Sequence, residues 1–325
     1  MQIQTYGLLL ALSLLCSIVI THFLSKEKME AQRSFWAIAL PLSLLGSRLL
    51  YILPNLRYYL EEVSYPLAML FFWDGGLSLF GALLGFLLAM SIAKKRGIFA
   101  DFHRFANAAF ATLWLFVCGM RFAEGFAGMG LGKPFDAENG GLFIVNIYDY
   151  SHLAVYRLEA VFAAIMLVAS LILFSKMYRK DDKLMDSYLG MLSLLMLSVS
   201  QVVFESMRND GHLLIGFIHV QQVLFAVLIV SLLYYIRSRL PIQSRMNSWL
   251  LLALVIVLVG IDFAMEFVVD GRLNLPLSLF GMSSFARNYL IISLVSACFA
   301  AIGIHFLCQL YCCRTALHQS KASEG

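Results

Sequence analysis

Nine apolar segments recur along this chain, and each is long enough to cross a lipid bilayer. They lie at 5–24, 35–53, 77–93, 104–122, 154–174, 187–204, 213–236, 248–269 and 288–310. A helix of about 20 apolar residues spans the hydrocarbon core, which is roughly 30 Å thick. Because a backbone in lipid must satisfy its own hydrogen bonds, unbroken apolar runs of this length favour helices. The sequence therefore predicts an all-α integral membrane protein, a polytopic helix bundle.

The composition agrees with this class and excludes others. Hydrophobic residues make up 61% of the 325 residues and charged residues 14%, whereas soluble domains average about half and about a quarter. The net charge of +4 comes with no basic stripe, so we expect the lipid bilayer as a partner and no nucleic acid. The six cysteines form no CxxC pair and no metal-like spacing with histidine, so we expect no metal site and no cofactor.

Three segments need a separate interpretation. Residues 54–76 are amphipathic and aromatic, which predicts an interfacial or re-entrant segment rather than a full span. Residues 270–287 form a short polar link. We expect the first apolar run to be a retained span, because no small-residue cleavage pattern follows it.

Basic residues predict the orientation of the spans. Sixteen of the 24 would lie on one side if nine spans alternate. They are Lys26, Lys28, Arg33, Lys94, Lys95, Arg96, Arg104, Lys176, Arg179, Lys180, Lys183, Arg237, Arg239, Arg245, Arg314 and Lys321. The positive-inside rule then places the N-terminus outside and the C-terminus in the cytoplasm.

Charged residues within or beside apolar runs gather on the opposite, non-cytoplasmic side. The arginines are Arg48, Arg121, Arg157 and Arg208, and the acids include Asp74, Glu124, Glu159 and Glu205. A charge near the hydrocarbon is costly and needs a partner or a function. Structural ion pairs at helix ends are one interpretation, since Arg121/Glu124 and Glu205/Arg208 are each three residues apart. Four arginines on one side favour a shared anionic ligand, and a phospholipid phosphate suits the planar guanidinium.

Four stretches in a fixed order resemble the prolipoprotein diacylglyceryl transferase family. They are TYGLLLAL with Tyr6 and Gly7, GSRLLYIL with Gly46, Arg48 and Tyr51, DGGLSLFGALLG with Gly75, Gly76, Gly81 and Gly85, and MRFAEGFAGMGLGKP with Arg121, Gly128, Gly132, Lys133 and Pro134. Weaker matches follow in VYRLEA with Glu159, QVVFESMRND with Glu205, Arg208 and Asp210, and VQQVL with Gln222. The resemblance covers about residues 6–225.

The resemblance implies an enzyme of the bacterial inner membrane, active in lipoprotein biosynthesis. Such an enzyme transfers diacylglyceryl from phosphatidylglycerol to the lipobox cysteine thiol in the signal peptide of a prolipoprotein, and releases glycerol 1-phosphate. It also implies a core of about seven transmembrane helices over residues 1–240. Residues 241–325 then form an additional pair of helices with a cytoplasmic tail, for which the sequence suggests no function.

The implied chemistry assigns roles to several residues. Arg121 is the first choice to stabilise the departing phosphate, with Arg48 and Arg208 as further choices. Glu124 either acts as the base for the thiol or neutralises Arg121. We predict Arg121, Glu124 and Arg208 as catalytic residues. The residues predicted to bind phosphatidylglycerol are Arg121, Arg48, Tyr6, Tyr51, Glu205 and Gly128.

Departures from the family pattern leave alternatives open. Phe80 stands where many members have a histidine, Gln201 replaces the first arginine of the RFxxExxR stretch, and Glu124 replaces an asparagine. His152 is a candidate replacement for the missing histidine. The alternatives are a family-derived enzyme that transfers a lipid or prenyl group to another acceptor, and a lipid-binding membrane protein without catalytic activity.

Overall fold

The computed structural model of this chain describes 2–61, 69, 71, 76–135, 141–147, 150–179, 188–209, 214–215, 218–240, 242–269, 272–273 and 284–323. Every structural statement concerns these residues. Asp74, Gly75 and Asp210, which the sequence singles out, lie outside them.

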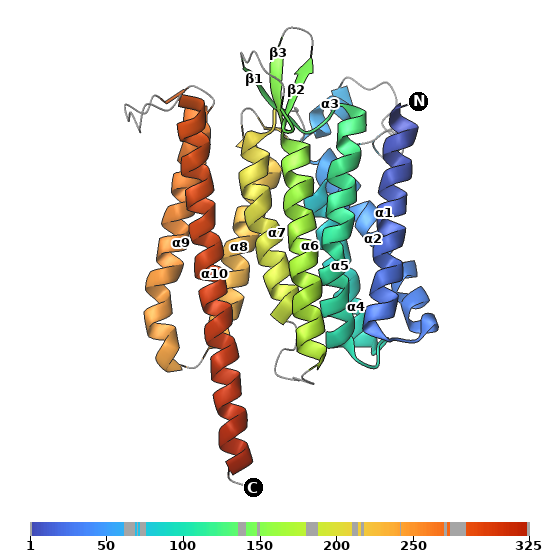
Figure 1. Cartoon of the computed structure of the whole chain (residues 1–325), viewed down its shortest axis with the longest axis vertical. Helices are drawn as coiled ribbons and strands as arrows, with labels where there is room; N and C mark the ends of the chain where they lie inside the picture. The colour runs from blue at the N-terminus through green and yellow to red at the C-terminus, as the bar shows by residue number, and fades with distance from the viewer. Residues whose placement is uncertain are drawn as a thin grey trace. The chain divides into compact units, whose positions relative to one another are not determined.

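Long helices dominate the architecture (Figure 1). They are α1 (Gln2–Ser25), α2 (Met29–Ile52), α4 (Leu79–Arg96), α5 (Phe102–Glu124), α6 (Val155–Arg179), α7 (Tyr188–Met207), α8 (Val220–Ser238), α9 (Ile242–Val269) and α10 (Ser284–Ser323). Among the described residues, 8 helices are long and apolar enough to cross a membrane. The remaining long helix, α4, occupies the predicted span 77–93, but its last turn holds Lys94, Lys95 and Arg96. The prediction of a polytopic helical membrane protein is confirmed.

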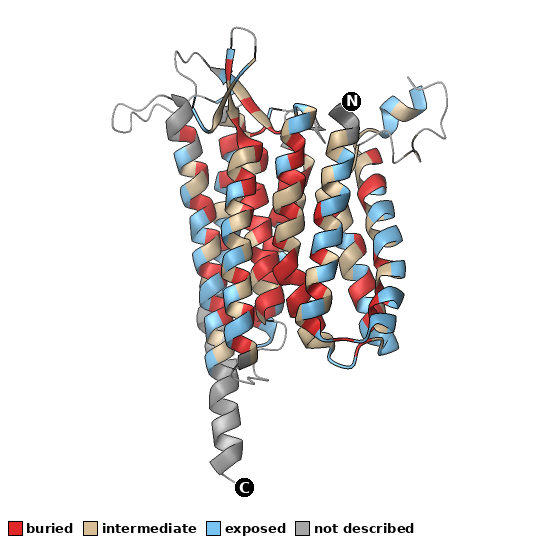
Figure 2. Cartoon of the chain, turned by 45° about the vertical axis from the view of Figure 1, so that its right-hand side comes forward, coloured by how far each residue is buried: buried red, intermediate tan, exposed pale blue. Residues whose placement is uncertain are grey.

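Many large apolar side chains on these helices are exposed, as is expected of helices that face lipid. On α1 the exposed residues Leu8, Leu12, Leu15, Val19 and Phe23 recur at intervals of three or four, which places them on one helical face. Figure 2 shows this exposed stripe along the helix that starts at the N-terminus. A soluble helix would carry polar residues on such a face.

Short strands interrupt the helical pattern in two places, which the sequence did not predict. β1 (Leu131–Phe135), β2 (Ile144–Ile147) and β3 (Tyr150–Ala154) form an antiparallel sheet in the order β1-β3-β2. β4 (Leu214–Ile215) pairs with β5 (Ile218–His219). The predicted start of a span at residue 213 is therefore wrong, because α8 begins only at Val220. A short apolar run has no periodicity that separates a strand from a helix.

The chain divides into two compact units. The first comprises Met1–Ile172 and Arg208–Gln221, and the second Leu173–Met207 and Gln222–Gly325. This division concerns packing. The division into a core over 1–240 and an addition over 241–325 concerns sequence relationship, and it stays a prediction.

Glycines bring α2 and α4 together in the first unit. A Cβ on Gly46 would meet the carbonyl group of Gly81, and one on Gly85 would meet the carbonyl group of Leu42. Small residues allow such close backbone approach in membranes, where no hydrophobic driving force holds helices together. Gly46, Gly81 and Gly85 thus act in helix packing, which fixes the start of α4. In the same unit α1 packs along α5.

In the second unit α10 packs against both α7 and α9. Met265 of α9 and Ile292 of α10 belong to one buried cluster, and Gly303 of α10 lies against Leu195 of α7. α10 continues as a helix to Ser323, well beyond the predicted span 288–310.

The segment 54–76 is only partly described. α3 (Leu56–Glu61) is a short helix with an exposed ion pair between Arg57 and Glu61, and residues 62–68, 70 and 72–75 lie outside the described residues. The predicted interfacial or re-entrant segment therefore stays a prediction.

Candidate active site

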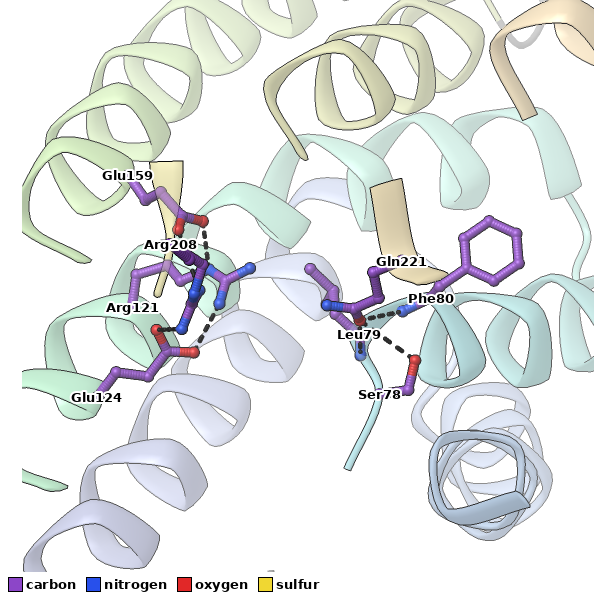
Figure 3. A network of polar contacts seen from close by, with 8 residues as sticks. All are labelled: Ser78, Leu79, Phe80, Arg121, Glu124, Glu159, Arg208 and Gln221. Atoms are coloured by element: carbon purple, nitrogen blue, oxygen red, sulfur yellow. Dashed lines mark hydrogen bonds and ion pairs between the residues drawn. The ribbon is translucent and has the colours of Figure 1, made fainter. Parts of the chain in front are cut away.

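Two arginines and two glutamates form a closed network in the first unit, which we call the arginine–glutamate quartet: Arg121, Glu124, Glu159 and Arg208. Nη1 of Arg121 lies 2.6 Å from Oε1 of Glu124, and Nε of Arg121 lies 2.5 Å from Oε2 of Glu159. Nη2 of Arg208 lies 2.7 Å from Oε2 of Glu124, and Nη1 of Arg208 lies 3.1 Å from Oε1 of Glu159. Each arginine thus bridges both glutamates, and each glutamate both arginines (Figure 3).

All four side chains of the quartet are buried, with between 1% and 8% of each exposed. Two positive and two negative charges balance, so the network carries no net charge when all four groups are ionised. Burial makes each ion costly to desolvate, and the mutual attraction offsets this cost only when the geometry is good. The loss of any one member would leave an uncompensated buried charge.

Three separate parts of the chain supply the quartet. Arg121 and Glu124 stand one turn apart at the end of α5, Glu159 stands near the start of α6, and Arg208 directly follows α7. The backbone at Gly130 and at the first residue of β1 joins these parts, because Tyr156 N donates to Gly130 O at 3.0 Å and Asn209 N donates to Leu131 O at 2.8 Å. The backbone therefore fixes the spacing of the four charges.

Gly130 is a position that only glycine fits. Its φ is +72°, and a Cβ there would lie 2.8 Å from the Cβ of Tyr156, 3.2 Å from Oε2 of Glu124 and 3.4 Å from Nη2 of Arg208. Gly128 also has a positive φ of +69°, but a Cβ on it would meet nothing within 4 Å. Gly128, predicted to bind lipid, is thus needed for a left-handed turn beside the quartet.

The structure brings together all three residues predicted as catalytic, Arg121, Glu124 and Arg208. Tyr6 of α1 lies close enough to interact electrostatically with all three. Glu205, predicted to bind lipid, is buried in the last turns of α7, the helix that leads into Arg208.

Arg48 and Tyr51 belong to a second cluster, at the end of α2. Arg48 is buried and donates from Nε to Met69 O at 2.7 Å, from Nη1 to Gly76 O at 3.2 Å, and from Nη2 to the hydroxyl of Tyr59 at 3.3 Å. Its guanidinium also lies 5.7 Å from the centre of the Tyr51 ring, and that ring covers Gly76, whose φ is +67°. These contacts hold the backbone that leads into α4.

Phe80 occupies the position where the family pattern often has histidine. Its backbone belongs to a hydrogen-bonded cap at the start of α4. The Oε1 atom of Gln221 accepts hydrogen bonds from Leu79 N at 2.9 Å, Phe80 N at 3.4 Å and Ser78 Oγ at 3.2 Å. Figure 3 shows this side-chain cap at the start of α4. A glutamine oxygen thus satisfies backbone donors that begin the helix.

His152, the candidate replacement for the missing histidine, is part of the sheet. It lies on β3, paired with Pro134 of β1 and Val145 of β2, and its Nδ1 lies 3.0 Å from the carbonyl oxygen of Gly132. This hydrogen bond ties the ring to the sheet. Gln201, another departure from the family pattern, is buried in α7.

Sequence reasoning did not include Glu159, Gly130 or Gln221 among the site residues. The charge balance of the apolar runs was the available signal for Glu159, because two buried arginines require two anions. The role of Gly130 depends on its φ and its neighbours, and that of Gln221 on the contact of its side chain with the start of α4. Sequence patterns contain neither.

Comparison with known proteins places this site within a matched region. Residues 1–237 match the family model described as "Prolipoprotein diacylglyceryl transferase". A protein of Streptococcus pyogenes serotype M1 named "Phosphatidylglycerol--prolipoprotein diacylglyceryl transferase" is 21% identical over 237 residues, which cover 70% of this chain and 90% of that protein.

Proteins of the same name show shorter matches in two other bacteria. The Fusobacterium nucleatum protein is 31% identical over 97 residues, 29% of this chain and 33% of that protein. The Ehrlichia canis protein is 38% identical over 73 residues, 22% of this chain and 26% of that protein. The chain thus spans about a third and about a quarter of the length of these two relatives.

Proposed function

Since this chain belongs to the prolipoprotein diacylglyceryl transferase family, we propose that it transfers the diacylglyceryl group of phosphatidylglycerol to the lipobox cysteine of prolipoproteins. The observation that carries the proposal is the arginine–glutamate quartet. It lies inside the matched residues 1–237 and holds two buried guanidinium groups in fixed positions. Guanidinium groups recognise phosphate through paired hydrogen bonds.

The reaction needs a stabilised leaving group and a deprotonated thiol. The cysteine thiolate attacks the glycerol carbon that carries the phosphate ester, a C–S bond forms, and the C–O bond breaks. The electron pair stays with the departing glycerol 1-phosphate. A fixed cation at that phosphate lowers the barrier, because negative charge grows there in the transition state. We assign this role to Arg121, with Arg208 as its partner.

Exchange of a carboxylate for the lipid phosphate would open the quartet. Glu124 is the better candidate to move, because it ends α5 and a turn with Gly125 and Gly128 follows it. Glu159 lies within α6 and would stay as the fixed counter-ion of both arginines. Glu124 released in this way would be free to accept the thiol proton, which unites its two predicted roles.

The other predicted lipid-binding residues receive supporting roles. Tyr6 would donate to a headgroup or phosphate oxygen beside Arg121. Arg48 and Tyr51 would shape the approach to α4 rather than bind phosphate, because three acceptors already engage Arg48. Glu205 and Gly128 would position Arg208 and the turn after α5.

We also propose the bacterial inner membrane as the location, with the N-terminus outside and the C-terminus in the cytoplasm. The placement of sixteen basic residues supports this orientation. The transferase activity would belong to residues 1–240, with 241–325 as an addition. Labelling of a single cysteine introduced at Ser320, in intact cells and in inverted vesicles, tests the orientation.

The activity test uses the purified full chain, phosphatidylglycerol and a peptide with a lipobox cysteine, and detects the lipid-modified peptide by mass. We expect modification by the wild-type protein and none by Arg121→Lys. This variant keeps the positive charge but loses the planar guanidinium group and its paired donors. Arg57→Ala is the matched control, because Arg57 forms an exposed ion pair with Glu61.

A second variant separates chemistry from folding. The double variant Arg121→Gln/Glu124→Gln removes one charge of each sign and keeps the quartet neutral, so we expect it to fold and to be inactive. Failure of a well-folded wild-type protein to modify the peptide would contradict the proposal. If the protein modified a different acceptor, the proposed lipid site would stand and the proposed acceptor would be wrong.

A further inference from the structure

A second group of buried polar side chains lies in the second unit, and its two acids belong to a helix beyond the family match. We call it the α8–α9 carboxylate cluster: Gln222 of α8 with Asp262 and Glu266 of α9. The Nε2 of Gln222 donates to Oδ2 of Asp262 at 3.2 Å and to Oε1 of Glu266 at 3.0 Å. All three side chains are buried.

The two acids lie inside the apolar span Trp249–Val268. They are four residues apart and therefore share one face of α9. Asp262 stands about two turns from the end of that span. Ionisable residues at such positions are costly and often mark sites for ions or protons. One amide group bridging two carboxylates supplies no positive charge.

Asp262 has an oxygen that the amide does not engage. Its Oδ1 atom is buried and has no hydrogen-bond partner among the described residues, and only 3% of the residue is exposed. Leaving a buried acceptor unsatisfied costs about 1–3 kcal/mol, and more for a charged group. This oxygen is therefore a candidate ligand for a bound cation.

Ser296 of α10 provides an independent observation that points to the same place. Only 1% of this residue is exposed, and its hydroxyl has no hydrogen-bond partner among the described residues. Other serines of the spanning helices, such as Ser198 and Ser231, donate to the carbonyl four residues before them. The hydroxyl of Ser296 makes no such bond and is available to another group.

The packing of α9 on α10 sets Ser296 at the level of Asp262. Met265 and Ile292 meet in one buried cluster, and the two helices run side by side in opposite directions (Figure 1). One turn back along α9 leads from Met265 to Asp262, and one turn forward along α10 leads from Ile292 to Ser296. Both steps go the same way, so the unsatisfied hydroxyl of α10 and the unsatisfied carboxylate oxygen of α9 lie at the same level of two packed helices.

We propose that Asp262, Glu266 and Ser296 bind a monovalent metal cation of the size of sodium. Carboxylate and hydroxyl oxygens are hard ligands that suit such an ion, and the cation would compensate one of the two buried carboxylate charges. A divalent calcium ion takes six to eight oxygen ligands, more than these side chains offer. Gln222 donates to both carboxylates and so fixes their positions.

The test measures thermal unfolding of the purified full chain in detergent, in sodium chloride, potassium chloride or choline chloride at equal ionic strength and fixed pH. A cation that binds only the folded protein raises the unfolding midpoint as its concentration rises. We expect this rise in sodium and none in choline, which is too large to enter. Asp262→Asn should abolish it.

Ser296→Ala is a second variant, in case Asp262→Asn does not fold. It keeps both carboxylates and removes only the hydroxyl group. We expect it to raise the sodium concentration needed for half of the stabilisation by about tenfold or more. Ser231→Ala is the matched control, because Ser231 is exposed and bonds within its own helix; it should leave the sodium response unchanged.

Equal midpoints in sodium and choline would overturn the proposal, as would a sodium response that persists in Asp262→Asn. Stabilisation that follows pH and ignores sodium would also overturn it and would assign a proton to the cluster. The proposal does not depend on transferase activity, because the measurement follows unfolding and its residues lie outside the quartet.

Discussion

The arginine–glutamate quartet and the α8–α9 carboxylate cluster solve the same physical problem in different ways. Both bury glutamate in a membrane protein, where an isolated charge is costly. The quartet opposes each carboxylate with two guanidiniums at 2.5 to 3.1 Å. In the carboxylate cluster one neutral amide, that of Gln222, donates to both carboxylates.

This difference separates a site closed by its own side chains from one that calls for a further ion. In the quartet the protein supplies all of the counter-charge, so a phosphate can enter only by exchange with a carboxylate. In the carboxylate cluster an oxygen of Asp262 and the hydroxyl of Ser296 lack partners among the described residues. The first arrangement suits an anion and the second a cation.

Removal of one quartet carboxylate should have the largest effect. Glu159→Ala leaves two buried guanidiniums with one counter-ion, and breaking a buried ion pair costs about 3–5 kcal/mol. Chemical denaturation of the purified protein measures this loss of unfolding free energy. Arg57→Ala, which breaks an exposed pair, should cost at most about 1 kcal/mol. Equal losses in the two variants would show that the quartet is not a closed network.

The two glycines beside the quartet provide the next test. Gly130→Ala adds a methyl group against Glu124 and Arg208 at a positive φ, and the strain and crowding together should cost about 3 kcal/mol. Gly128→Ala adds only the backbone strain, about 1 kcal/mol. The difference in unfolding free energy between these variants reports the space that the ion pairs need. No difference would contradict the packing described for Gly130.

The carboxylate cluster should respond less strongly to loss of its donor. Gln222→Leu removes the amide that donates to Asp262 and Glu266, and we expect a loss of about 1–3 kcal/mol of unfolding free energy. If sodium binds as proposed, the loss should shrink in high sodium. If Gln222→Leu lost as much unfolding free energy as Glu159→Ala, the carboxylate cluster would depend on its donor as strongly as the quartet depends on its ion pairs.

Tyr6→Phe should have the smallest effect on stability. It removes one hydroxyl near the quartet and no charge, so the unfolding free energy should fall by at most about 1 kcal/mol. Its effect should appear in the rate of peptide modification, where a lost hydrogen bond of 1 kcal/mol corresponds to roughly a fivefold decrease. An unchanged rate would remove Tyr6 from the proposed lipid site.

The sequence predicted the spans and the meeting of Arg121, Glu124 and Arg208, because apolar length and charge spacing depend on local sequence. It did not predict β1–β3, nor that Gly130 and Leu131 accept backbone hydrogen bonds from Tyr156 and Asn209. Nor did it distinguish Arg48, held by backbone carbonyls, from Arg121, held by carboxylates. Both arginines interrupt apolar runs, and only tertiary contacts separate their environments. The sequence also did not predict the contact of the α9 acids with Gln222, which lies forty residues before Asp262.

The length of α10 has a practical consequence for how the membrane meets this protein. A helix of 40 residues is about 60 Å long, twice the thickness of the hydrocarbon core, roughly 30 Å. Its apolar span ends at Gln309, so the turns from there to Ser323 extend beyond the hydrocarbon core. A protease or a bulky probe in the aqueous phase should reach this extension without disturbing the bundle. It offers a handle for immobilising the intact protein, with both buried clusters left untouched.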